Sequence, residues 1–368
     1  MSEVLLAVGT KKGLFLGWSR DRVEWEWQGP HQSMAAVAAV AIDTRRNPAR
    51  LLVGGRNEHW GPAVFSSDDF GQTWVEHPKG SPVFPADAGA DVEQIWQLQP
   101  GPASRPDEVW AGVEPSALFR SSDGGETFTL VRSLWDHPHR PDWHPGAGGQ
   151  CLHTVLPHPD DADRVLVAMS TGGVYATEDG GESWNPSNRG VSAPFMPDGE
   201  PEYGQCVHKV VRDPDDPDLL VLQNHGGVFR SEDGGASWQS AEQGLPANFG
   251  FGLTRTKGSD GAFFAFPLSA DLNRFPVDGR AGVYRSVDSA RAWSDSSGGL
   301  PETGFHTIVL RDALTCDDAD PAGVYFGTRS GEVWASSDSG RSWSEIVNHL
   351  PDVLCVRAAV VDAGPQNA

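Results

Sequence analysis

The chain has 368 residues, of which 28 are Lys or Arg and 50 are Asp or Glu, so its formal net charge is −22. This excess of negative charge opposes binding to nucleic-acid phosphates and to anionic lipid surfaces, and we expect neither partner. The 43 Gly, 28 Pro and 14 Trp favour tight turns and aromatic packing over long helices, which predicts an all-β protein. The N-terminal stretch MSEVLLAVGTKKGLFLGW lacks the features of a secretory signal, no stretch is long enough to span a bilayer, and the four cysteines do not resemble a disulfide framework. We therefore expect a cytoplasmic protein with reduced thiols.

One short pattern recurs along the chain: Ser or Thr, any residue, Asp, any residue, Gly, any residue, Ser or Thr, and then Trp or Phe. An eroded copy, GLFLGWSRDRVEW (13–25), opens the chain. The later copies are AVFSSDDFGQTW (63–74), ALFRSSDGGETF (117–128), GVYATEDGGESW (173–184), GVFRSEDGGASW (227–238), GVYRSVDSARAW (282–293) and GEVWASSDSGRSW (331–343). Their spacing of roughly 50 to 55 residues is typical of a β-propeller blade built from four short strands.

We therefore predict one all-β domain, a seven-bladed β-propeller of four-stranded blades. Blade one combines 1–27 with 353–362, because the C-terminal strand follows the last copy of the pattern and completes the blade that the N-terminus begins. This closure leaves no open sheet edge. The other blades are predicted at 34–76, 92–131, 151–187, 206–240, 249–295 and 305–346. Their inner strands, and that of blade one, are predicted to begin near Met34, Val92, Cys151, Cys206, Phe249, Phe305 and Val353.

The repeated pattern resembles the Asp-box, or bacterial neuraminidase repeat, of sialidase-like β-propellers, and the resemblance covers the whole chain. It implies that the boxes are structural and lie on the face opposite the active site. The chain departs from sialidases, which have six blades, three arginines that clamp the substrate carboxylate, and an Arg-Ile-Pro segment that this sequence lacks. The resemblance implies a catalytic role for Tyr203, beside Glu202, in a metal-free sialidase-like exo-glycosidase, which is one alternative function. Other Asp-box propellers hydrolyse plant glucans with paired carboxylates.

Two of the predicted inner strands begin with Cys-x-His, at 151–153 and 206–208. Aligning the inner strands on the turns that follow them places one residue of each at the same level: Ala38, Gln94, His153, His208, Phe251, His306 and Arg357. Neutral imidazoles on rigid strands are good ligands for a divalent transition metal, so we predict Zn, Fe, Mn or Cu at His153, His208 and His306. Metal-free acid–base chemistry by these histidines and a water-bridged structural ring are the alternatives.

Loops on the same face supply further candidate side chains. Glu58 and Glu114 are candidate general acids or bases, because a carboxylate beside a desolvated cleft can exchange protons with a substrate. The candidate substrate-binding residues are Arg56, Asn57, Trp60, Gln94, His225, Arg329 and Arg357. Three long insertions, at 132–150, 189–205 and 267–282, are expected to cover the site.

The sequence thus predicts an enzyme with a His-rich, metal-binding active site at the propeller mouth. A hydrolase or lyase that acts on a small polar, anionic or saccharide-like molecule is the leading interpretation, and metal-dependent oxidation is a further option. The alternatives are the exo-glycosidase named above and a non-catalytic binding or assembly scaffold, similar to seven-bladed photosystem-assembly factors. We expect a monomer.

Overall fold

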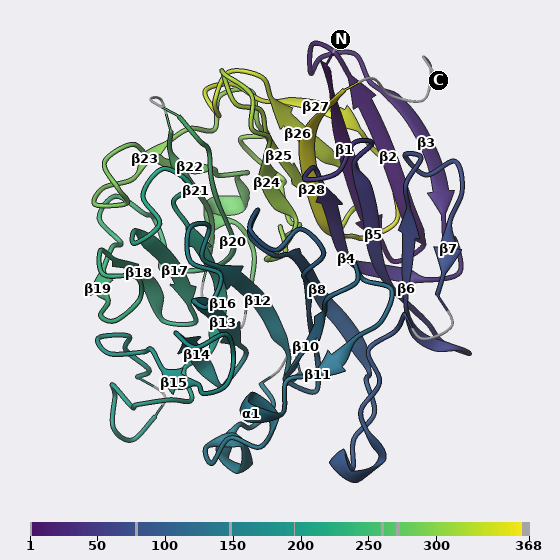
Figure 1. Cartoon of the computed structure of the whole chain (residues 1–368). Helices are drawn as coiled ribbons and strands as arrows, with labels where there is room; N and C mark the ends of the chain where they lie inside the picture. Colours follow the sequence, from purple (N-terminus) through teal and green to yellow (C-terminus); the bar gives the residue numbers. More distant parts are fainter. Residues whose placement is uncertain are drawn as a thin grey trace.

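A computed structural model describes residues 2–77, 80–146, 149–194, 196–258, 261–269 and 273–362. In these ranges the chain forms seven sheets of four antiparallel strands, which confirms the predicted seven-bladed β-propeller. The inner strands of successive blades contact one another around a complete ring. Strand β28 pairs with β1, so the C-terminal strand closes the ring; Figure 1 shows it in yellow beside the purple N-terminal strands.

Within each blade the four strands follow one another from the inner to the outer edge. Blade one contains β28 (Val353–Asp362), β1 (Ser2–Thr10), β2 (Gly13–Ser19) and β3 (Glu26–His31). Blade two contains β4 (Ala36–Asp43), β5 (Arg50–Asn57), β6 (Gly61–Ser67) and β7 (Val75–Glu76). Blade three contains β8 (Gln94–Pro100), β9 (Val109–Glu114), β10 (Ala117–Ser121) and β11 (Thr129–Leu130). Blade four contains β12 (Leu152–Pro157), β13 (Val165–Met169), β14 (Gly173–Thr177) and β15 (Asn185–Pro186).

Blade five contains β16 (Val207–Arg212), β17 (Leu220–Asn224), β18 (Gly227–Ser231) and β19 (Gln239–Ser240). Blade six contains β20 (Phe249–Arg255), β21 (Phe263–Leu268), β22 (Tyr284–Ser286) and β23 (Ser294–Asp295). Blade seven contains β24 (Leu314–Cys316), β25 (Val324–Gly327), β26 (Val333–Ser336) and β27 (Ser344–Val347). The described helices are short: α1 (Arg132–Trp135) and the 3-10 turns η1 (Ala86–Ala88), η2 (Arg140–Asp142) and η3 (Val277–Gly279). None of them has the length and apolar character needed to cross a membrane.

The hydrophobic core lies between the blades. Alternate residues of a strand point to opposite faces of its sheet. In β13, Val165, Val167 and Met169 are buried against blade three, whereas Leu166 and Ala168 are buried against blade five. Each sheet is therefore apolar on both faces, and neighbouring blades bury each other.

The repeated pattern forms the hairpin between the third and fourth strands. In the copy at 227–238, Ser231 Oγ donates to Asp233 Oδ1 (2.7 Å) and accepts from Gly235 N (2.9 Å). The Asp233 carboxylate also accepts from Ser237 N (2.9 Å) and Ser237 Oγ (2.6 Å). Gly235 has φ +99°, a left-handed conformation that favours glycine. The Ser, Asp and Gly of the pattern thus serve the turn itself.

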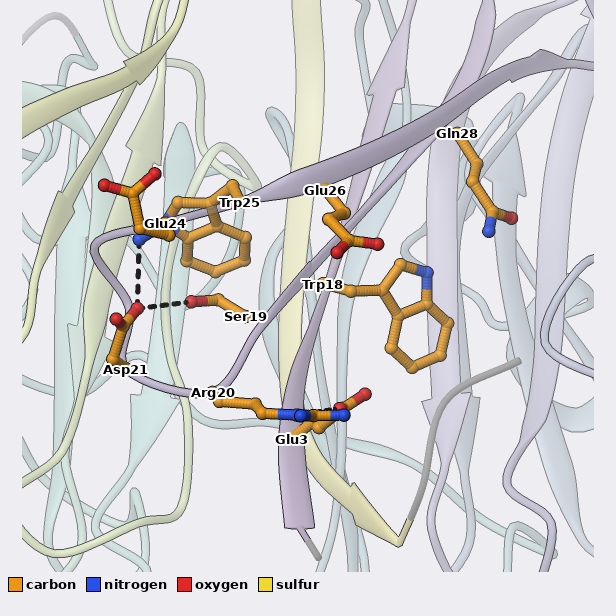
Figure 2. A pocket seen from close by; sticks show the side chains of 9 residues that line it. All are labelled: Glu3, Trp18, Ser19, Arg20, Asp21, Glu24, Trp25, Glu26 and Gln28. Carbon is orange, nitrogen blue, oxygen red and sulfur yellow. Dashed lines mark hydrogen bonds and ion pairs between the residues drawn. The ribbon is translucent and has the colours of Figure 1, made fainter. Parts of the chain in front are cut away.

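The aromatic residue that ends the pattern joins its blade to the preceding one. Trp238 Nε1 donates to Ser187 O (2.8 Å), which follows β15 of blade four. The same bond links Trp293 to Ala241 and Trp343 to Ser296. In the eroded first copy, Asp21 Oδ1 accepts from Ser19 Oγ and from Glu24 N, and Figure 2 shows this hairpin beside a cavity of about 400 Å³ on the outer strands of blade one.

Blade seven departs from the predicted strand positions. Its inner strand begins at Leu314, not near Phe305. The segment before it bonds to the preceding insertion instead, because Phe305 N donates to Gly279 O (2.8 Å) and Ala281 N donates to Pro301 O (2.9 Å). This shift moves His306 away from the level at which the sequence alignment places it.

Candidate active site at the propeller mouth

The ladders of six inner strands, β4, β8, β12, β16, β20 and β28, shift register near the same end. In β4, β8, β12 and β16, one residue has no partner in the ladder to the second strand: Ala38, Trp96, His153 and His208. A bulge bends a strand and re-aims its side chains. Both histidines consequently bond to the next inner strand, His153 Nε2 to Val207 O (2.9 Å) and His208 Nδ1 to Gly250 O (2.6 Å).

A cavity of about 410 Å³ opens at this end of the ring, opposite the repeated hairpins, and we call it the mouth pocket. Its lining residues are Gly146, Ser170, Thr171, Pro194, Cys206, His208, His225, Phe251, Arg274 and Arg311. The three long insertions each contribute one described residue to it: Gly146, Pro194 and Arg274. Blades four to seven and the insertions thus build one pocket around histidine, arginine and cysteine side chains.

Cys206, His208 and His225 form a compact cluster in this pocket. One potential metal-ligand atom from each of them lies within 4.8 Å of the other two. The Cys206 Sγ to His208 Nε2 distance is 3.7 Å, and the His208 and His225 rings lie 5.6 Å apart. Burial lowers the pKa of His208 to about 3, so its imidazole is neutral near pH 7.

Of the predicted metal ligands His153, His208 and His306, only His208 belongs to the closely grouped ligand atoms found among the described residues. His153 is fully buried, and its ring nitrogens bond to Thr154 Oγ1 (3.0 Å) and Val207 O (2.9 Å). His306 is exposed and contacts the Phe275 ring at 5.7 Å. His153 is therefore engaged within the protein interior, and His306 lies outside the inner strand of its blade.

Arg311 connects the mouth pocket to blade three. Its guanidinium carbon lies 5.1 Å from the centroid of the Trp96 ring. Its Nη1 lies 3.2 Å from Cys151 Sγ. The Arg274 guanidinium lies about 6 Å from the Phe249 and Phe251 rings (6.0 and 5.8 Å), and both rings also pack against His208. Two guanidinium groups therefore line one pocket of a protein whose net charge is strongly negative.

Glu114, at the end of β9, lies beside Arg311. Its carboxylate accepts a hydrogen bond from Trp96 Nε1 (2.9 Å), and a Cβ placed on Gly149 of the 132–150 insertion would overlap it. Burial raises the pKa of Glu114 above its usual value, and the charge of Glu93 adds to this effect. The Trp96 hydrogen bond and the charge of Arg311 act in the opposite direction. Among the candidate carboxyls of the sequence, this one has the half-buried environment of a proton donor.

Lys209 and Asp312, each next in sequence to a residue that lines the pocket, form an ion cluster with Arg357; Lys209 and Asp312 are buried and Arg357 is half-buried. Asp312 Oδ1 accepts from Lys209 Nζ (2.7 Å) and from Arg357 Nη2 (2.6 Å). The two cations hold the pKa of the Asp312 carboxyl well below its usual range, despite burial. Arg357, predicted to bind substrate, is engaged in this cluster, where its Nη1 also donates to Asp312 O (3.1 Å).

Several other predicted residues lie outside the mouth pocket. Arg329 is exposed and forms an ion pair with Asp352 (2.7 Å). Glu58 and Arg56 are exposed on blade two. The charge of Arg56 lowers the pKa of Glu114 on blade three. Gln94 lies opposite Glu114 in the ladder between β8 and β9. Asn57 and Trp60 line a separate cavity of about 590 Å³ on blade two.

Tyr203 does not have the environment of a nucleophile. Its hydroxyl donates to Asp142 Oδ2 (2.8 Å), and its ring stacks on His139 with centroids 3.9 Å apart. The hydrogen bond to Asp142 raises the pKa of Tyr203, whereas a phenol that attacks a substrate requires the opposite shift. Tyr203 instead joins the 189–205 insertion to the 132–150 insertion.

The sequence alignment missed Arg311, Asp312 and Trp96. The turns after the inner strands close through equivalent bonds, from His158 N to Arg164 O, from Asp213 N to Leu219 O and from Asp317 N to Gly323 O. Residues five positions before these turns are His153, His208 and Asp312, so Asp312 occupies the level that the alignment assigned to His306. The Asp-rich segment CDDADP at 316–321 was the available signal, since it marks the turn.

The buried neutral imidazole of His153 predicts acid sensitivity. Burial, together with the charges of Arg311 and Lys209, lowers the pKa of His153 well below its usual value. Below about pH 6.5 the unfolded chain takes up a proton at this residue that the folded chain does not bind, so stability falls as pH falls. We expect His153→Gln to weaken the pH dependence of the free energy of unfolding between pH 7 and pH 5, measured by denaturant titration. The exposed His306→Gln is the control, and equal slopes for all three proteins would contradict the prediction.

The curated proteins whose sequences match this chain are named as xyloglucanases. No family model matches the chain. The chain is 27% identical over 187 residues to a probable oligoxyloglucan-reducing end-specific xyloglucanase of Neosartorya fischeri, covering 49% of this chain and 22% of that protein. It is 24% identical over 273 residues to a xyloglucanase of a Paenibacillus species, covering 66% of this chain and 25% of that protein. The chain therefore spans about a quarter of the length of these curated relatives.

Solved structures support the fold. An ancestral GH74 enzyme superimposes with a TM-score of 0.56 at 17% identity, covering 85% of this chain and 38% of that one. YCF48 bound to a D1 peptide superimposes with a TM-score of 0.51 at 15% identity, covering 85% and 83%. Both likenesses are at the level of architecture. The chain is a seven-bladed β-propeller whose relatives by sequence include xyloglucanases.

Proposed function

We propose that the protein is a glycoside hydrolase whose active site combines the mouth pocket with Glu114, and that its substrate is a small saccharide carrying an anionic group. The proposal rests on the environment of Glu114. Its carboxyl is half-buried, has a raised pKa and accepts a hydrogen bond from the Trp96 indole, which lies beside Arg311. The xyloglucanase relatives support a saccharide substrate. The hydrogen bonds within the repeated hairpins support their assignment as Asp-boxes.

Hydrolysis of a glycosidic bond needs a proton on the leaving oxygen and a water molecule at the anomeric carbon. In this proposal Glu114 donates the proton, because its raised pKa keeps the carboxyl protonated to higher pH than that of an exposed glutamate. Glu93, whose charge acts on Glu114, is the second carboxylate at this edge and would activate the water.

The two arginines favour an anionic substrate. Arg274 and Arg311 line the same pocket, and planar guanidinium groups bind carboxylates and phosphates through paired hydrogen bonds. Phe251 lines the same pocket, 5.8 Å from the Arg274 guanidinium, and offers an apolar surface against which a sugar ring can lie. Two guanidinium groups in one pocket attract a substrate that carries negative charge more strongly than they attract a neutral glycan.

A panel of aryl glycosides tests this proposal. The panel contains anionic substrates, such as a glucuronide, a sialoside and a 6-phosphoglucoside, and neutral glucosides and xylosides. We expect kcat/KM for at least one anionic substrate to exceed that for the neutral substrates by about 100-fold. Arg274→Gln should raise KM for that member about tenfold or more. Arg329→Gln, on the rim and paired with Asp352, is the matched control and should leave KM unchanged. Preference for neutral xyloglucan oligosaccharides, or no turnover of any glycoside, would overturn the proposal.

A further inference from the structure

The two Cys-x-His segments have the same sequence pattern and the same bulge, yet their side chains have different partners. In the first, His153 uses both ring nitrogens within the protein, and Cys151 Sγ contacts Ser170 Oγ (3.3 Å) and Arg311. In the second, His208 Nδ1 bonds to Gly250 O (2.6 Å), and Nε2 is directed at Cys206 Sγ. The second segment lines the mouth pocket, and the first pair, Cys151 and His153, does not.

We infer that Cys206, His208 and His225 bind one transition-metal ion, and that this ion is Zn²⁺. Tetrahedral zinc with one sulfur and one nitrogen ligand places these two atoms about 3.6 Å apart, from bond lengths of about 2.3 and 2.05 Å. The observed Sγ to Nε2 distance of 3.7 Å matches this value, and the ligand atom of His225 lies within 4.8 Å of both. A thiolate with two imidazoles is a donor set that zinc favours over harder ions such as Mg²⁺.

The surrounding contacts hold the ligands in place. A Nδ1 to carbonyl bond, as between His208 and Gly250, is the usual outer contact of a metal-binding histidine, because it fixes the tautomer and turns the other nitrogen toward the metal. The His208 ring packs against both the Phe249 and the Phe251 ring, with centroids 5.2 and 4.8 Å away. His225 N donates to Cys206 O (2.9 Å), which ties the turn after β17 to the start of β16.

Three protein ligands leave a fourth position for a substrate oxygen or for water. Because all three ligand residues line the mouth pocket, this fourth ligand would come from the pocket, which Arg274 and Arg311 also line. The inference concerns metal binding alone and does not depend on the identity of the substrate.

Metal content and cobalt spectroscopy test the inference. Protein purified without a chelating tag should contain about one zinc per chain by mass spectrometry. The Co²⁺-exchanged protein should show the near-ultraviolet thiolate-to-cobalt absorption. Both signals should be lost in Cys206→Ser and in His225→Gln, and kept in Cys151→Ser, the matched residue of the other segment. The His225 variant alters a turn outside the strands, so it keeps the test decisive if Cys206→Ser does not fold.

Three outcomes would overturn the inference: no binding of added Zn²⁺ or Co²⁺ by the wild type, retention of the metal by the Cys206 and His225 variants, or equal loss in Cys151→Ser. These results are separable from those of the glycoside panel. A metal-free protein that cleaves anionic glycosides would reject the zinc site and keep the proposed function, and a zinc protein without glycosidase activity would do the reverse.

Discussion

Glu114→Gln is expected to lower kcat by about 100-fold or more for natural glycosides, with KM changed by less than about threefold. Glutamine has the shape of the glutamic acid side chain and still accepts the hydrogen bond from Trp96, so the pocket is preserved. The amide cannot give a proton to the leaving oxygen. The loss should therefore be small for aryl glycosides whose leaving group needs no proton, such as 2,4-dinitrophenyl glycosides, and large for those with a poor leaving group.

The pH profile gives this prediction a second readout. Because burial raises the pKa of Glu114, the acid form persists to higher pH than usual, and kcat should fall as pH rises through that raised value. The Trp96 hydrogen bond favours the charged form and lowers this pKa. Trp96→Phe should therefore move the falling limb of the profile to higher pH, whereas the exposed Glu58→Gln should leave both kcat and the limb unchanged. If the fall of kcat at high pH occurs at the same pH in Trp96→Phe, or is still present in Glu114→Gln, the proton donor is a group other than Glu114.

The blades were predictable from the sequence because their main determinants are local. Ser231, Asp233 and Gly235 lie within five positions and bond to one another, so the pattern in the sequence is the hairpin itself. Ring closure followed from counting strands, and β28 lies beside β1 as expected. Local chemistry of this kind does not depend on where the rest of the chain lies.

The candidate site was less predictable because it depends on contacts between distant segments. Cys151–His153 and Cys206–His208 have the same local pattern, and their different partners come from elsewhere in the chain, Arg311 in one case and His225 in the other. Counting five residues back from the turn at 316–321 would have placed Asp312 correctly. The bond between Phe305 and Gly279, which moves His306 off the inner strand, involves an insertion without a repeated counterpart, and no periodic pattern reports it.

Asp312→Asn is expected to destabilise the fold by about 3–5 kcal/mol, because it removes one partner from a buried ion cluster and leaves the others uncompensated. Lys209 and Arg357 both bond to Asp312 Oδ1, and the relative exposures of the three side chains are 10%, 22% and 3%. An asparagine can accept a hydrogen bond, but it brings no negative charge to the two cations. Denaturant unfolding at pH 7 measures the change in free energy, and the midpoint of thermal unfolding should fall by roughly 5 °C.

Two controls separate charge burial from the loss of a surface ion pair. Asp352→Asn removes the partner of Lys11 and Arg329 on the rim, where the cations are about half exposed (54% and 44%), and should cost less than about 1 kcal/mol. The triple variant Lys209→Met, Asp312→Leu, Arg357→Met replaces the whole cluster by apolar side chains and should regain most of the stability lost in Asp312→Asn. If Asp312→Asn is no less stable than Asp352→Asn, the two cations do not depend on Asp312 for compensation. Their positive charge would then be available to an anionic substrate above them, and the anion site of this propeller would extend from the mouth pocket down into the ring.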